Sequence, residues 1–89
     1  MARVKISDMI IEWLGNQSDG STIANHNIQT DCVQFIKSWH QRSVLPSTVE
    51  REFRRLRNQE SHLLRDSGLE LTDQQMKYGE NTWTLRNNL

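Results

Sequence analysis

The sequence predicts a mainly α-helical domain that ends in a small β-hairpin. Three segments carry apolar residues at helical spacing, and near the C-terminus apolar and polar residues alternate as they do in half-buried strands. The chain has 89 residues, which suits one compact domain and leaves no room for two. We therefore expect a single domain over residues 1–89, which is either a complete protein or one domain of a larger one.

The first helix is expected from about Ser7 to Leu14, because its apolar residues fall on one helical stripe: Ile6, Met9, Ile10, Trp13 and Leu14. Ser7 is placed to cap the helix at its N-terminus, and Gly15 is placed to end it in a left-handed conformation. A loop is expected from Asn16 to Asn27, with a short extended stretch at residues 22–24.

The second helix is expected from Asp31 to Gln41, with Thr30 as its N-cap. Its apolar stripe consists of Cys32, Phe35, Ile36 and Trp39. Cys32 is the single cysteine of the chain, so no internal disulfide can form and a buried structural thiol is expected. The tryptophans are expected to face the core: Trp13, Trp39 and Trp83.

The third helix is expected from Ser47 to Asn58, with a continuation towards Leu64 left open. A short connection over residues 42–46 precedes it, and Ser47 with Glu50 fits a capping box. Its apolar stripe is Val49, Phe53 and Leu56. The opposite side, which we call the arginine face, carries Ser47, Arg51, Arg54, Arg55 and Asn58.

A hairpin is expected after a turn at residues 66–68. Residues 69–72 and 82–86 alternate between apolar and polar side chains, and Trp83 and Leu85 share one face of the second strand. Residues 73–81 show no clear pattern, although Gly79 favours a turn between the strands.

The net charge of zero hides an uneven distribution. From Lys37 to Arg65 there are seven basic and three acidic residues, a net of +4. The rest of the chain has four basic and eight acidic residues, a net of −4. The total excludes a uniformly basic peptide that coats nucleic acid, but positive charge gathers around the third helix.

The arginine face has chemistry that suits DNA. The planar fork of arginine matches guanine or a phosphate, an asparagine can pair with adenine, and Ser47 and Thr48 with the free amides of the first turn can hold a phosphate. The expected phosphate contacts are Arg42, Arg51, Arg55 and Arg57. The candidates for base readout are Arg51, Arg54 and Asn58. A face that is merely solvated is the alternative, because arginine and glutamate are good helix formers.

The residues that carry a family resemblance are Leu45-Pro46-Ser47-Thr48-Val49-Glu50-Arg51-Glu52-Phe53-Arg54-Arg55-Leu56-Arg57, followed by Thr82-Trp83-Thr84-Leu85. With the order helix, helix, turn, basic helix and hairpin, the chain resembles the winged helix-turn-helix family. In that family the third helix enters the major groove, and the wing contacts the neighbouring backbone or minor groove. The resemblance implies a three-helix winged helix-turn-helix fold and double-stranded DNA as partner.

By the same resemblance, the residues that face DNA would be Ser47, Thr48, Arg51, Arg54, Arg55 and Asn58, and the wing contacts would be Lys77, Tyr78 and Asn81. The chain departs from the family pattern in three places. The turn at residues 42–46 has no glycine, the second helix is longer than usual, and the link at residues 59–67 is long.

Such a module would serve transcription regulation or origin binding in replication initiation. A homodimer on a repeated or palindromic site is one expected form. The alternative function is a protein-interaction module, such as an inhibitor or an assembly factor, whose arginine face binds an acidic partner.

Other classes of function are not supported by the sequence. The candidate zinc ligands His26, Cys32, His40 and His62 match no ligand spacing, and no catalytic motif is present, so no metal, cofactor or enzymatic activity is expected. The longest mostly apolar run, residues 6–14, is too short and too polar for a membrane span. A single cysteine is compatible with a reducing compartment, and we expect a cytoplasmic protein.

Overall fold

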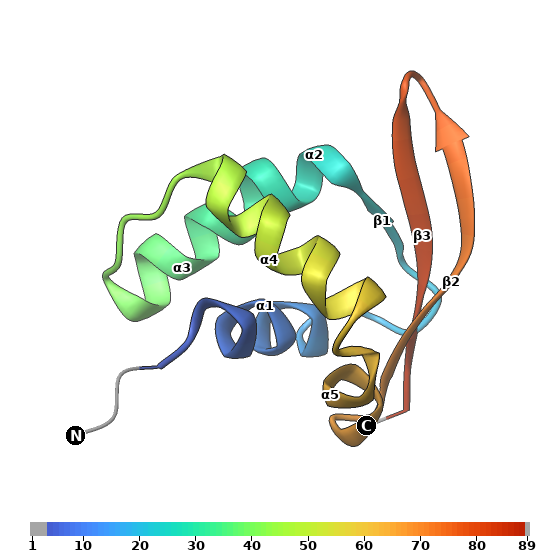
Figure 1. Ribbon diagram of the computed structural model, residues 1–89, viewed down its shortest axis with the longest axis horizontal. Coiled ribbons are helices and arrows are strands. Elements are labelled where there is room, and N and C mark those ends of the chain that lie inside the picture. The colour runs from blue at the N-terminus through green and yellow to red at the C-terminus, as the bar shows by residue number, and fades with distance from the viewer. Residues whose placement is uncertain (1–3, 89) are drawn as a thin grey trace.

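The computed structural model describes residues 4–88 as a mixed α/β domain with helices packed against a three-stranded antiparallel sheet (Figure 1). The elements in order are α1 (Ile6–Gly15), β1 (Thr22–Ala24), α2 (Asn25–Asn27), the π-helical turn η1 (Ile28–Cys32), α3 (Val33–His40), α4 (Pro46–Asn58), α5 (Ser61–Asp66), β2 (Leu69–Lys77) and β3 (Glu80–Asn87). The predicted helices and the C-terminal hairpin are confirmed. The expected extended stretch at residues 22–24 pairs into the sheet, and α5 is a separate helix rather than a continuation of α4.

The sheet has the order β1-β3-β2, so the last strand of the chain lies in its centre. Ile23 on β1 lies opposite Trp83, and Leu71 on β2 lies opposite Leu85. The register of β2 shifts between Thr72 and Gln75, where Asp73 has a φ of 53°. This irregularity, together with the exposure of residues 73–77, explains why the sequence there shows no alternation.

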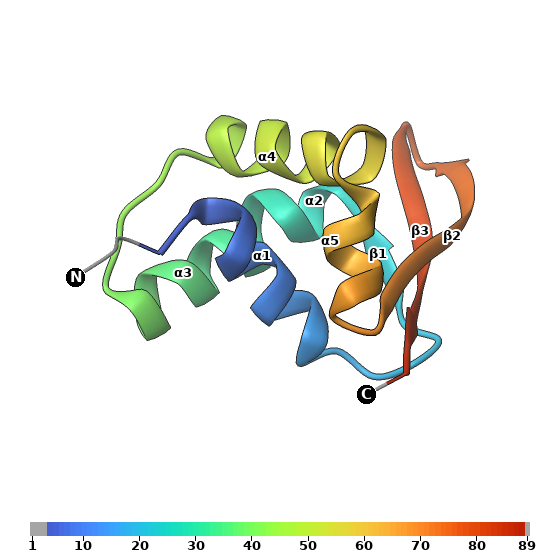
Figure 2. The same cartoon turned by 60° about the horizontal axis from the view of Figure 1, so that its bottom comes forward.

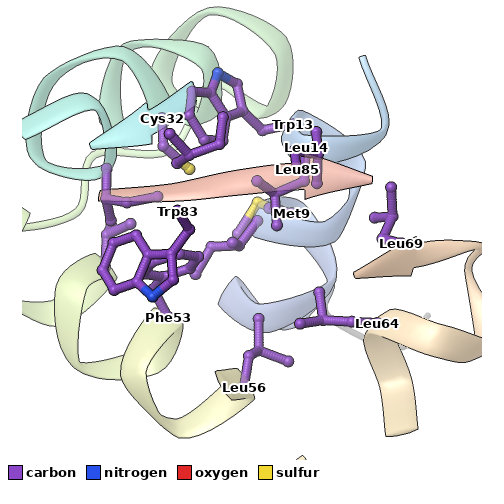
Figure 3. Packing of buried hydrophobic residues seen from close by; sticks show 14 of the residues in the cluster. Met9, Trp13, Leu14, Cys32, Phe53, Leu56, Leu64, Leu69, Trp83 and Leu85 are labelled. Atoms are coloured by element: carbon purple, nitrogen blue, oxygen red, sulfur yellow. The ribbon is translucent and has the colours of Figure 1, made fainter. Parts of the chain in front are cut away.

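The core lies between the helices and one face of the sheet (Figure 3). The predicted stripes of α1 and α4 are buried: Met9, Ile10, Trp13 and Leu14 from α1, and Val49, Phe53 and Leu56 from α4. Trp83 and Leu85 bring β3 into the same cluster. Among the described residues, no helix combines the length and hydropathy needed to cross a membrane.

The predicted helix caps at both ends of α1 are wrong. Lys5 is the N-cap, Ser7 lies inside the first turn, and Gly15 is the last helical residue. The chain leaves α1 through Asn16 with a φ of −88°, so the helix needs no left-handed residue at its end. The Trp13 carbonyl in the last turn accepts two hydrogen bonds of 3.1 Å, one from the Asn16 amide and one from the side chain of Gln17.

The predicted capping box of α4 is also wrong, because the helix begins one residue earlier. Leu45 is the N-cap without a side-chain hydrogen bond, and Pro46 is the first helical residue. Proline is favoured at that position because its φ is already helical and it has no amide hydrogen to satisfy. Ser47 therefore lies in the first turn.

The second helical segment begins well before the predicted Asp31. α2, η1 and α3 follow one another without a break over residues 25–40, and Gln41 ends the helix with a φ of 50°. The side chain of Asn27 accepts a hydrogen bond of 2.9 Å from the Ala24 amide and closes the start of the helix. Thr30 is inside the segment, and its hydroxyl donates to the His26 carbonyl at 2.7 Å instead of capping.

Trp39 is the clearest error in the predicted core. Cys32 and Ile36 are fully buried as expected, but Trp39 is 73% exposed. A helical stripe places residues on one side of a helix, but it does not show how far along that helix the neighbouring elements reach. Trp39 belongs to the last turn of α3, where its aromatic neighbour is the half-buried Phe35, with ring centroids 6.0 Å apart.

A contact between residues far apart in sequence joins the hairpin to the start of the second helical segment. The carboxylate of Glu80 accepts hydrogen bonds from the backbone amide and the Nδ1 atom of His26, both at 2.7 Å. These hydrogen bonds, the side-chain one first, lower the pKa of Glu80 below its ordinary value of 4.5. The ionised carboxylate thus holds β3 to a helix N-terminus.

We expect acid to weaken this contact. Because the pKa of Glu80 is lower in the folded than in the unfolded chain, the stabilisation is present above the ordinary value of 4.5 and is lost as the pH falls through the folded value. The melting temperature should fall less between about pH 6 and pH 3 in Glu80→Gln than in the wild type. Glu70→Gln is the matched control, since Glu70 is exposed. Equal acid sensitivity of the Glu80→Gln variant and the wild type would contradict this role.

Candidate nucleic-acid interface

α4 is held by its apolar side and presents its polar side to solvent. Val49 and Phe53 are fully buried, and the helix packs on α1 and η1. On one flank the side-chain amide of Gln29 donates a hydrogen bond to the carboxylate of Glu50, which links α4 to η1. These contacts fix the rotation of α4 about its axis, so the arginine face points away from the core.

The centre of the arginine face is open, as the sequence predicted. The side chains of Ser47, Arg51, Arg54 and Asn58 are exposed. Within residues 4–88, Arg51 and Arg54 form no ion pair or side-chain hydrogen bond. Their guanidinium groups are therefore available to an outside anion without breaking an internal contact.

Arg55 has a different environment from its neighbours. Its Nε atom lies 3.2 Å from a carboxylate oxygen of Glu60, and its Nη1 atom lies 3.9 Å from Glu52. Glu60 lies just before α5, so the bend between the two helices brings this carboxylate back to α4. A phosphate at Arg55 would have to compete with two carboxylates, which places this residue at the flank of the face.

The start of α4 offers fewer free amides than the sequence suggested. Pro46 has none, and the amides of Thr48 and Val49 both donate to the Leu45 carbonyl, at 3.0 and 3.2 Å. The amide of Ser47 remains, next to its own exposed hydroxyl and the half-buried Thr48. Ser47 therefore offers the main free hydrogen-bond donors at this end.

Arg57 is set back from the arginine face. Its guanidinium carbon lies 4.3 Å from the centroid of the Trp83 ring and 5.0 Å from that of Phe53. Its buried Nε atom has no hydrogen-bond partner among the described residues. Burial first, and then repulsion from Arg54, lower the pKa of Arg57. Arg57 was predicted to contact a phosphate. In the folded chain it is largely a packing residue that joins α4 to β3.

Arg42 lies on the connection before α4 and is likewise engaged. Its Nη1 atom donates a hydrogen bond of 2.7 Å to the carbonyl of Val4. This contact ties the segment before α1 to the connection between α3 and α4. Because the side chain stays partly exposed, a phosphate contact through its other nitrogen atoms is still sterically open.

The hairpin rises beside the C-terminal part of α4 in both views (Figures 1 and 2). The rings of Phe53 and Trp83 meet edge to face, with centroids 5.2 Å apart, and this contact sets the position of the hairpin against the helix. Lys77 and Tyr78 are exposed at the tip, whereas Asn81 is half-buried and pairs with Met76 across the ribbon. Two of the three predicted wing residues are therefore free to reach a partner.

The tip is a two-residue turn in which both residues have left-handed backbone conformations. Lys77 pairs with Glu80, and between them Tyr78 has a φ of 52° and Gly79 a φ of 79°. This type I′ geometry favours asparagine and glycine, and a tyrosine in it is strained. The exposed ring of Tyr78 thus comes with backbone strain in the turn. Strained residues of this kind are common at binding sites.

Replacing Tyr78 with asparagine is expected to stabilise the protein by about 0.5–1 kcal/mol, because asparagine tolerates this conformation. Thermal denaturation would measure the gain. Met76→Asn is the matched control, since Met76 is also exposed but lies in an extended strand, where asparagine is disfavoured. If Tyr78→Asn left the melting temperature unchanged or lowered it, the strain argument would be wrong.

A groove of about 410 Å³ lies between the end of α4, α5 and β2. Asn58, Ser61 and Arg65 line one side, Glu70 and Asp73 line the other, and Trp83 contributes to its floor. The groove extends the polar surface from the end of the arginine face towards the hairpin. The long link that departs from the family pattern thus becomes α5, which fills the space between α4 and the sheet.

The residues considered as metal ligands lie apart. Within the described part of the chain, no group of three histidine, cysteine, aspartate or glutamate side chains could hold a metal ion. Cys32 is fully buried, and burial, followed by the charge of Asp31, raises the pKa of its thiol to about 12. The thiol is therefore protonated and inert at neutral pH.

Two contacts that hold α4 and the hairpin in place could not be predicted from the sequence. Gln29 and Glu50 are 21 residues apart and His26 and Glu80 are 54 residues apart, so no local pattern joins them. The packing of Arg57 against the core was predictable from the sequence, because Arg57 follows Phe53 by four residues on the same side of the helix.

Comparisons with protein-family models, curated proteins and solved structures found no match to this chain.

Proposed function

We propose that this chain is a winged helix-turn-helix module that binds double-stranded DNA, with α4 in the major groove and the β2–β3 hairpin as the wing. The observation that carries the proposal is the arginine face. Arg51, Arg54 and Asn58 are exposed together on one side of a helix whose other side is fully buried. Arginine and asparagine are the side chains best suited to guanine and adenine in the major groove.

The arrangement of the sheet supports the proposal further. The hairpin follows α4 in the chain, packs on it through Phe53 and Trp83, and carries Lys77 and Tyr78 at its exposed tip. A helix packed beside a hairpin with an exposed tip can contact a groove and the neighbouring backbone at once. Transcription regulation and origin binding in replication initiation both use such a module, and a homodimer on a repeated site is the form we propose for either role.

Binding to duplex DNA at two salt concentrations tests this function. The affinity for random duplex should fall steeply between about 50 and 200 mM salt, because phosphate contacts release counterions. Replacing Arg51, if it contacts a phosphate, should weaken binding to every sequence alike and reduce the salt slope by about one. Lack of binding even at low salt would overturn the proposal.

Arg86→Ala is the matched control for that experiment. It removes the same charge from β3, where Arg86 is exposed and lies 3.8 Å from Asp19, away from α4. The DNA affinity of this variant should stay close to that of the wild type. An equal loss in Arg86→Ala and Arg51→Ala would mean that overall charge, rather than the arginine face, determines binding.

A further inference from the structure

A second surface, which contains no residue of α4 or of the hairpin, lies between α1 and the segment η1–α3. It is a groove of about 570 Å³ whose aromatic lining is Trp13, Phe35 and Trp39. Trp39 is 73% exposed, although its ring is the largest apolar group on α3. Large exposed aromatic side chains in a groove are typical of sites where another protein binds, and tryptophan is enriched among the residues that dominate such interfaces.

The charges around this groove have one sign. Glu12 and Asp31 line it together with neutral polar side chains, and no lysine or arginine is among the lining residues. Glu12 receives a hydrogen bond of 3.2 Å from the imidazole of His40, and Asp31 accepts one of 2.8 Å from Asn27, so both carboxylates are held in place. An acidic rim around an aromatic floor is complementary to a cationic segment with an apolar side.

The groove is independent of the arginine face. Its lining residues come from residues 12–17 and 31–39, whereas α4 begins at residue 46. Figure 2 shows α4 on one side of the molecule, with α1 and α3 beneath it. A partner in the groove would therefore leave Arg51 and Arg54 accessible.

We propose that the groove between α1 and α3 binds a basic amphipathic helix of a partner protein. The apolar side of that helix packs on Trp39 and Phe35, and its lysines or arginines pair with Glu12 and Asp31. A groove between two helices suits a helical occupant, because apolar side chains at helical spacing enter it from one side. A second copy of the chain is disfavoured as occupant, since two acidic rims would meet across a symmetric contact.

The test uses two synthetic peptides of about 16 residues, long enough to form a helix. Both carry leucine at positions i, i+3, i+4 and i+7, and one has lysine and the other glutamate at the remaining positions. The affinity of the full chain and of its variants is measured by isothermal titration calorimetry, and in the wild type the contact is located through the indole N–H signal of Trp39 in nuclear magnetic resonance spectra. The lysine peptide should move this signal, and the glutamate peptide should not.

Three variants place the binding site. Trp39→Ser should weaken binding of the lysine peptide by about tenfold or more, and Glu12→Gln with Asp31→Asn should weaken it severalfold. Leu45→Ser is the matched control, because Leu45 is exposed to a similar degree, at 68%, but does not line the groove. Its affinity should equal that of the wild type. Trp39→Ser should fold normally, since the side chain is mostly in solvent.

Several results would overturn the proposal. These are absence of lysine-peptide binding to the wild type, equal binding to Trp39→Ser, or an equal shift of the Trp39 signal by the glutamate peptide. Self-association of the free chain that Trp39→Ser abolishes would instead identify a second copy as the occupant. None of these results bears on DNA binding, which is measured separately through Arg51 and Arg54.

Discussion

The Phe53→Ala variant is expected to lose about 3–5 kcal/mol of its free energy of unfolding. Phe53 is fully buried, and its ring meets Trp83 edge to face at 5.2 Å. The same ring supports the guanidinium group of Arg57 at 5.0 Å. Alanine at this position would leave a cavity at the junction of α4 and β3, and Arg57 would keep one aromatic neighbour instead of two.

A loss of this size is a large share of the total stability of a small domain, which is about 5–15 kcal/mol. Urea denaturation followed by circular dichroism would measure it. Phe53→Leu keeps most of the volume and should cost about 1.5 kcal/mol or less, and Arg54→Ala on the exposed side of the same helix should stay within about 0.5 kcal/mol. If Phe53→Ala cost no more than Phe53→Leu, Phe53 would not join the helix to the sheet as described.

The double variant Arg51→Ala, Arg54→Ala should lose most of the proposed affinity for duplex DNA. Each arginine that contacts a base or a phosphate contributes about 1–3 kcal/mol, so the pair should lower the affinity by about thirtyfold or more. The fold should be unaffected, because both side chains are exposed and unpaired within residues 4–88. Direct titration of a labelled duplex would measure the loss, with a melting curve as a check on folding.

Arg54→Lys separates base readout from phosphate binding. Lysine keeps the charge but loses the planar fork, so a residue that reads guanine should lose discrimination between sequences while a phosphate contact should be nearly unchanged. Sites selected from a random duplex pool provide the preferred sequence for this comparison. Uniform weakening across all sequences would assign Arg54 to the backbone, and unchanged affinity of the double variant would remove α4 from the interface.

The amphipathic character of α4 was predictable because it is local. Val49, Phe53 and Leu56 recur at helical spacing, so their burial and the exposure of Arg51 and Arg54 follow from the period of the helix alone. The strand alternation around Trp83 and Leu85 is equally local, and both residues are buried. The same reasoning failed at helix ends, where Pro46 rather than Ser47 begins α4. Residues one or two positions apart can each serve as the first residue of a helix, so the local sequence does not fix the boundary.

The sequence by itself determined the order of the helices, the hairpin and the side of α4 that carries the arginines. These features depend on the spacing of apolar residues at neighbouring positions in the chain. Only the tertiary structure decided which arginines are free. Glu60 returns to Arg55 through the bend before α5, and Arg57 is covered by Trp83 from a strand 26 positions further along the chain, at 4.3 Å. It also decided that Trp39 stays in solvent, because the reach of neighbouring elements along a helix depends on how they pack in space.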